Sequence, residues 1–174
     1  MTDWIKASNP AAPITTEAEA ISAARASALA IFLGVAWGIV GIVLLMTGGS
    51  AEMEAAMAAA SADAPEMAGM GEMAMQIAMW SAIGLTVIQL VLGLVQWAKP
   101  NIVIPIIFAI LVAFGLVSGV LGLMMSGQEG MPESAAPTWQ IYVGFVILVI
   151  QLILHIAGIR GARMLDKLQM AAAQ

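Results

Sequence analysis

Five polar or aromatic side chains interrupt apolar stretches of this sequence, and their spacing predicts that they meet. Gln151 and His155 are four residues apart, which places them on one face of a helix. Counted from the nearest basic residue, Trp37, Gln89 and Gln151 lie at similar depths, with Gln96 and His155 just below them. An amide without a partner in lipid is costly, so we expect these side chains to hydrogen-bond between helices.

This polar group has two interpretations. It is either a set of interhelical hydrogen bonds that holds the fold together, or the lining of a cavity for a small amphiphile such as a quinone or a lipid. His155 is the only histidine, so haem would need a second ligand from a methionine or from the other chain of a dimer. Histidines within membranes mostly hydrogen-bond, and we therefore expect no resident cofactor.

Methionines form a second pattern, in which five of them follow one another at short intervals: Met67, Met70, Met73, Met75 and Met79. Thioethers are soft ligands that select Cu(I). The spacing resembles the methionine-rich segments of extracytoplasmic copper-handling proteins, and the step from Met75 to Met79 resembles the Ctr family of copper transporters. The resemblance implies a Cu(I) site, but the three-span architecture of that family does not match, and no His or Cys lies nearby. Alternatively, methionine replaces leucine as an unbranched helix filler.

Catalytic motifs are missing from the sequence. It contains no phosphate-binding loop, dinucleotide fingerprint, zinc-protease motif or cysteine. An enzyme needs an acid, a base or a nucleophile beside its substrate, and only His155 and carboxylates outside the apolar stretches are present. The apolar stretches contain no carboxylate, which argues against a proton-coupled pump or transporter. We therefore expect a protein that is not an enzyme.

The elements that carry these residues follow from the distribution of charge. Hydrophobic residues make up 61% of the 174 residues and charged residues only 10%, whereas soluble proteins have about 25% charged residues. This composition excludes a soluble enzyme, a nucleic-acid-binding protein and a disordered tail. Four windows contain no charged residue, and each is longer than the roughly 20 residues that span a bilayer: residues 26–51, 73–98, 100–128 and 134–159.

We predict an all-α polytopic membrane protein, a bundle of four transmembrane helices. A transmembrane β-barrel would instead alternate apolar and polar residues over shorter segments. The predicted helices lie near residues 26–47, 76–98, 102–126 and 139–158. The chain then divides into an N-terminal segment, a membrane domain with a Met- and acid-rich outer loop, and a short basic tail: residues 1–25, 26–159 (loop 48–75) and 160–174. Thr16 with Glu19 predicts a capping box, and Asn101 predicts a cap on the third helix.

Two pairs of segments have similar sequences. Residues 88–92 read IQLVL and residues 150–154 read IQLIL, while residues 41–46 and 119–124 read GIVLLM and GVLGLM. Two explanations stay open. The chain is a duplicated helical hairpin, or its apolar helices resemble one another by composition, since repeats are convincing mainly over more copies.

Small residues recur on the first and third predicted helices. Such faces let helix backbones approach closely in lipid. They serve packing within the chain or, alternatively, the contacts of a homo-oligomer or of a larger complex. The glycines concerned are Gly34, Gly38, Gly115, Gly119 and Gly122.

Charge asymmetry predicts the orientation. With four spans, every basic residue falls on the side of the two termini, and all charged residues on the other side are acidic. The positive-inside rule places the termini in the cytoplasm, in a bacterial-type inner membrane. We expect an accessory or scaffold subunit of a membrane complex, or a homo-oligomer, whose partners are the bilayer and other membrane subunits, and not nucleic acid. The alternative function is binding or transport of Cu(I) or of a small amphiphile.

Overall fold

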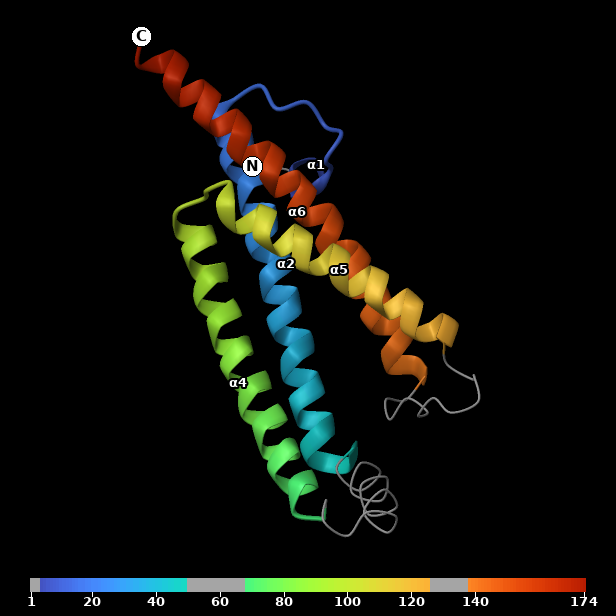
Figure 1. Cartoon of the computed structure of the whole chain (residues 1–174). Helices are drawn as coiled ribbons and strands as arrows, with labels where there is room; N and C mark the ends of the chain where they lie inside the picture. The colour runs from blue at the N-terminus through green and yellow to red at the C-terminus, as the bar shows by residue number, and fades with distance from the viewer. Residues whose placement is uncertain (1–3, 50–67, 126–137) are drawn as a thin grey trace.

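The computed structural model describes residues 4–49, 68–125 and 138–174, and no strand occurs in these ranges. Four of its helices are long and apolar enough to cross a membrane (Figure 1). The chain is therefore a multi-pass membrane protein, and the predicted all-α four-helix bundle is confirmed. The elements are α1 (Trp4–Ser8), α2 (Glu17–Leu44), the π-helical turn η1 (Leu45–Gly49), α4 (Ala68–Ala98), α5 (Val103–Met125) and α6 (Thr138–Ala172).

Two side-chain caps determine where α2 and α5 begin. The Thr16 hydroxyl accepts a hydrogen bond from the Glu19 backbone N–H at 3.2 Å, and the Glu19 carboxylate accepts one from the Thr16 N–H at 3.3 Å. The side-chain oxygen of Asn101 accepts hydrogen bonds from the backbone N–H groups of Val103 and Ile104, both at 3.0 Å. Both predicted caps are confirmed, and each satisfies N–H groups that a helix start leaves unpaired.

Besides α2, which begins at Glu17 after the Thr16 cap, two helices extend further than the predicted spans. α4 begins at Ala68, and α6 continues to Ala172 through most of the segment predicted as a tail. Gly161 does not end α6, because the helix is packed against α2 at this position. Beyond the membrane, the Gln169 amide donates a hydrogen bond to the Glu17 carboxylate at 3.2 Å. This contact keeps the last turns of α6 beside the start of α2.

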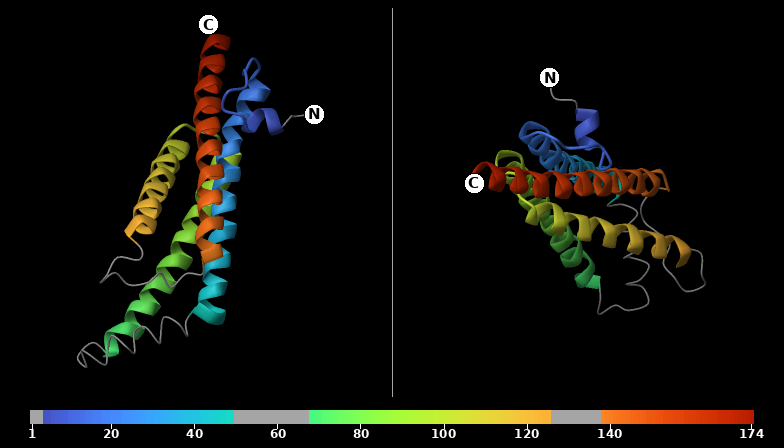
Figure 2. Two further views of the ribbon diagram at one scale, coloured as in Figure 1. Left: turned by 90° about the vertical axis from the view of Figure 1, so that its right-hand side faces the viewer. Right: turned by 90° about the horizontal axis from the view of Figure 1, so that it is seen from above.

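The helices pack in the order α4–α2–α6–α5. α2 and α6 form the central pair, α4 packs on α2, and α5 packs on α6, whereas α4 and α5 form no comparable interface within the described ranges. The pair α2–α4 and the pair α5–α6 diverge toward the ends that lie away from the termini (Figures 1 and 2). Two copies of one hairpin, α2–α4 and α5–α6, placed side by side in the same orientation would give this order. The order agrees with a duplication but does not test it, and the duplication stays a prediction.

The close approach of α2 and α6 depends on two glycines of α6. A Cβ added to Gly161 would lie 2.3 Å from the backbone nitrogen of Ala24, and one added to Gly158 would lie 2.5 Å from the Cβ of Ser27. These distances are shorter than van der Waals contact, so the two helix backbones touch where α6 carries no side chain. The facing stretch of α2 is rich in alanine, and residues 26–28 and 30 are fully buried.

The N-terminal segment folds back over the bundle at the end where the termini lie. Trp4 of α1 stacks on Trp97 of α4, with ring centroids 5.8 Å apart and an interplanar angle of 12°. The Arg25 guanidinium lies 5.2 Å from the centroid of the same indole, and its Nε donates a hydrogen bond to the Trp97 carbonyl at 3.0 Å. Trp97 therefore joins α1, α2 and α4 at one point.

Candidate functional site: the polar seam on α2

Gln151 and Gln89 converge on Gly34 of α2. A Cβ at position 34 would lie 2.5 Å from the Gln151 Nε2 and 3.7 Å from the Gln89 Oε1. The buried Gln151 amide donates a hydrogen bond to the Ala30 carbonyl at 2.9 Å, so it binds the backbone of α2 and not the other amide. Gln89 is half-buried and forms no hydrogen bond with any described residue.

His155 lies at a point where three helices meet. Its Nδ1 is 2.8 Å from the hydroxyl oxygen of Ser27 in α2, and its ring stacks on Phe108 of α5 with centroids 5.6 Å apart. The relative exposure of His155 is 0%, and its Nε2 has no hydrogen-bond partner among the described residues. The imidazole is therefore enclosed between helices, with one ring nitrogen paired and the other without a partner among the described residues.

Gln96 joins α4, α2 and the turn that leads into α5. Its Nε2 donates to the carbonyls of Ala24 at 3.2 Å and Asn101 at 3.1 Å, and its Oε1 accepts from the Asn101 N–H at 3.3 Å. Gln96 and His155 do not hydrogen-bond to each other. Each of them binds α2 instead, at Ala24 and Ser27, which are three residues apart.

Trp37 lies apart from the two amides. Its ring packs edge-on against Trp139 with centroids 6.4 Å apart, and its Nε1 is 3.7 Å from the position of a Cβ on Gly144. Gly144 and Gln151 belong to the same helix but are about 10 Å apart along its axis, at ~1.5 Å per residue. The structure therefore places Trp37 between α2 and α6 nearer the outer ends of the helices, and not with Gln151.

Four of the five glycines predicted as a packing or oligomer face pack within the chain. A Cβ on Gly38 would lie 3.1 Å from the Thr86 hydroxyl oxygen, and one on Gly119 would lie 2.8 Å from the Phe145 ring. Gly34 faces Gln151, and Gly115 faces Leu148. Gly122 differs, since a Cβ there would meet nothing within 4 Å.

Three further glycines with close contacts were not singled out from the sequence. They are Gly158 and Gly161, which meet α2, and Gly93, whose Cβ would lie 2.7 Å from the Phe32 ring. The pattern Ala157-Gly158-x-x-Gly161-Ala162 carries the signal for two of them, because it repeats small residues at helical spacing. Small-residue faces were predicted on the first and third helices only.

The methionine pattern is only partly described by the structure. Met67 lies outside the described residues, and Met70 and Met75 fall on the first turns of α4. Met73 is exposed, and Met79, six residues further along, is half-buried. Among the residues that the structure describes, no three His, Cys, Asp or Glu side chains group as they would around a metal ion. The Cu(I) site, which would use thioethers, stays a prediction.

The polar seam consists of Gln89, Gln96, Gln151 and His155, and the contacts that it forms are of the kind that associates helices. Gln96, Gln151 and His155 each direct a polar atom at α2, and the first two bind backbone carbonyls. Side-chain hydrogen bonds to a neighbouring helix are a common means of holding transmembrane bundles together. Comparison with protein-family models, with curated proteins and with solved structures finds no match to this chain.

Proposed function

We propose that this protein is a non-catalytic structural subunit that self-associates in the membrane through α4. The observation that supports the proposal is the amide of Gln89, which is half-buried in the middle of a spanning helix and has no hydrogen-bond partner among the described residues. An amide without a partner in lipid is unfavourable by about 1–3 kcal/mol on mutational scales. A contact that provides both a donor and an acceptor would remove this cost.

A second copy of the chain supplies such a contact. An amide side chain carries both donors and an acceptor, so two Gln89 side chains related by a two-fold axis satisfy each other. α4 also has room for a partner. Only 6% of the residues in its most apolar part are buried, against 22% for α6, because α4 packs on α2 alone among the spanning helices.

The orientation belongs to the same proposal. The six basic residues of the chain, which lie with the termini on one side of the four spans, support a cytoplasmic location for both ends. We propose a bacterial-type inner membrane as the location, with the acidic outer connections on the opposite face. In this arrangement Gln89 lies near mid-membrane, ten residues from Lys99.

Cross-linking tests the proposal directly, because the chain has no native cysteine. We expect a Leu85→Cys variant, which is exposed one turn from Gln89 and keeps that amide, to form a disulfide-linked dimer in native membranes on mild oxidation. A Val91→Cys variant, on another exposed position of the same helix, should stay monomeric. The mass in mild detergent, measured by light scattering, provides a second readout. It should be that of a dimer for the wild type and for the exposed-site control Gln76→Leu, and that of a monomer for Gln89→Leu.

Two results would contradict self-association. One is a wild-type protein that is monomeric in detergent, together with a Leu85→Cys variant that does not cross-link. The other is copurification of a different membrane protein that is lost in Gln89→Leu. This second result would assign the face of α4 to a hetero-complex, in which the chain is an accessory subunit.

A further inference from the structure

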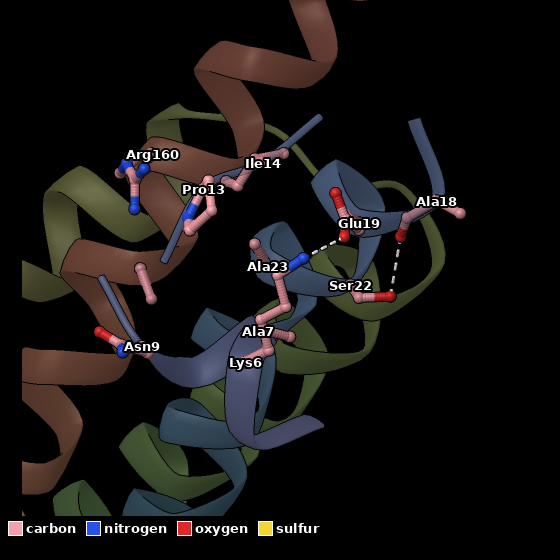
Figure 3. Close-up of a pocket in the computed structure, with 11 residues that line it drawn as sticks. Lys6, Ala7, Asn9, Pro13, Ile14, Ala18, Glu19, Ser22, Ala23 and Arg160 are labelled. Carbon is pink, nitrogen blue, oxygen red and sulfur yellow. Dashed lines mark hydrogen bonds and ion pairs between the residues drawn. The ribbon is translucent and has the colours of Figure 1, made fainter. Parts of the chain in front are cut away.

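A cavity lies outside the polar seam, at the end of the bundle that carries the termini. Its volume is about 390 Å³, within the roughly 300–1,000 Å³ range of small-molecule sites. α1 and the segment that follows it form one side of the cavity, and the first turns of α2 and a middle part of α6 form the other (Figure 3). Small apolar side chains such as Ala18, Ala23 and Ala157 line much of the wall.

Three charged side chains line the cavity, and two of them pair with each other. Lys6 forms an ion pair with Glu19, whose second carboxylate oxygen accepts hydrogen bonds from the Thr15 N–H at 2.8 Å and the Thr15 hydroxyl at 2.9 Å. These two charges therefore neutralise each other. Arg160 reaches the cavity from α6, apart from this pair (Figure 3).

Arg160 has hydrogen-bonding capacity left. One of its guanidinium nitrogens donates to the Pro10 carbonyl, and no carboxylate of the described residues pairs with it. A guanidinium carries several N–H donors in a planar fork that matches the oxygens of a carboxylate or a phosphate. The lining of the cavity therefore has one net positive charge, and part of the Arg160 guanidinium has no partner among the described residues.

An apolar groove lies next to the cavity, and Asn9 lines both. Trp4, Ile5 and Ile153 line the groove, and both isoleucines are exposed. Ile153 belongs to the spanning part of α6 and lies about 10 Å from Arg160 along the helix, at ~1.5 Å per residue. The groove thus leads from the lipid-facing side of α6 toward the positively charged cavity.

We propose that the cavity and the groove together bind an anionic amphiphile. Its phosphate or carboxylate group pairs with Arg160, and its alkyl chain lies beside Trp4 and Ile153. The occupant is an anionic phospholipid of the leaflet on the side of the termini, because the groove includes Ile153 on the spanning part of α6. This inference does not rest on self-association, since neither Gln89 nor any other residue of α4 lines the cavity or the groove.

Tryptophan fluorescence provides the test, because Trp4 lines the groove. The purified full chain in detergent is titrated with phosphatidylglycerol whose acyl chains carry bromine, a short-range quencher, and in parallel with brominated phosphatidylcholine. We expect saturable quenching that is tighter for the anionic lipid. Arg160→Gln should raise the Kd for phosphatidylglycerol about tenfold or more, since charge-assisted hydrogen bonds are lost. The matched control Arg163→Gln, at an exposed position next along α6, should keep the wild-type Kd.

Further variants separate binding from folding. Arg160→Lys keeps the charge and should recover part of the affinity, which a general loss of structure would not allow. Trp4→Phe should reduce the quenching amplitude, because it removes the tryptophan beside the proposed alkyl chain.

Other outcomes decide against the proposal or refine the source of the anionic group. Equal affinity for the two phospholipids, or equal Kd values for Arg160→Gln and Arg163→Gln, would overturn it. Displacement of the lipid by millimolar inorganic phosphate would also overturn it, in favour of a free anion. Brominated stearate that binds more tightly than phosphatidylglycerol would overturn the phospholipid as the occupant and identify a fatty acid in its place.

Discussion

The hydroxyl oxygen of Ser27 and the Nδ1 of His155 are 2.8 Å apart, and both residues are fully buried at the contact between α2 and α6. The imidazole also stacks on Phe108, so this one hydrogen bond orients a ring on which three helices pack. The Nε2 on the far side of the ring has no partner among the described residues. The stability of the contact therefore depends on the Ser27 hydroxyl.

We expect Ser27→Ala to lower the free energy of unfolding by about 1 kcal/mol, because the buried imidazole loses its partner. His155→Phe should have a similar or smaller effect, since a phenyl ring keeps the stacking on Phe108 and removes the unpaired nitrogen. The double variant should be closer to the wild type than the sum of the two changes. Unfolding by SDS in mixed micelles measures all three, and strictly additive effects would show that the hydrogen bond does not contribute.

Gly161→Ala should separate α2 from α6. The added Cβ would lie 2.3 Å from a backbone nitrogen, which cannot move out of the way as a side chain can. We expect a loss of about 1–3 kcal/mol in the free energy of unfolding, as for overpacked cores. Gly84→Ala is the matched control, because a Cβ there meets nothing within 4 Å. It should leave stability unchanged or raise it by up to about 1 kcal/mol through helix propensity. Similar stabilities for the two variants would contradict the backbone contact.

Gln96→Leu should destabilise the α4–α5 turn. The substitution leaves the Asn101 N–H and the Ala24 and Asn101 carbonyls without the amide that they share, at a cost of about 1–3 kcal/mol. Gln89→Leu removes an amide from the same helix that has no partner among the described residues, and should not lower the stability of the monomer. Hydrogen exchange at residues 99–104 should increase in the first variant only. An equal increase in both variants would show that the turn does not depend on Gln96.

Topology follows from labelling single cysteines introduced into the cysteine-free chain. Ala11 and Ala173 lie in exposed positions near the termini, and Gln76 lies in an exposed position near the opposite end of α4. A membrane-impermeant maleimide added to intact cells should label Gln76→Cys, and should label the other two variants only after the cells are permeabilised. The reverse pattern would invert the proposed orientation, and labelling of Ala11→Cys and Ala173→Cys from different sides would contradict a four-span chain.

The four spans could be predicted because charge is costly in lipid, and the positions of charged residues alone bound the apolar windows. The caps at Thr16 and Asn101 could be predicted for a similar reason, since each satisfies N–H groups within three residues of itself in the sequence. Such local constraints are visible in a single sequence. The extension of α6 to Ala172 was not predicted, because it depends on contacts with α2 that are distant in sequence.

The partners of the polar side chains could not be predicted from depth alone. Hydrogen bonds between helices are predicted for these side chains, and Gln96, Gln151 and His155 do form them, but each bonds to α2 and not to another member of the group. The reason is the small-residue surface of α2, which brings its backbone carbonyls within reach of a neighbouring amide. The cavity at Arg160 was missed because α1 and residues 9–16 form part of it by folding back. The sequence of that segment, with Pro10 and Pro13, gives no sign of where it docks.

Gly158 and Gly161 bring the backbone of α6 into direct contact with that of α2. This contact fixes how closely the two central helices pack on the side of the termini. A further contact between these two helices, the Trp37 ring edge-on against Trp139, lies toward their other end. α4 and α5 form no comparable interface with each other within the described ranges, so their relative position depends on the packing of α2 on α6.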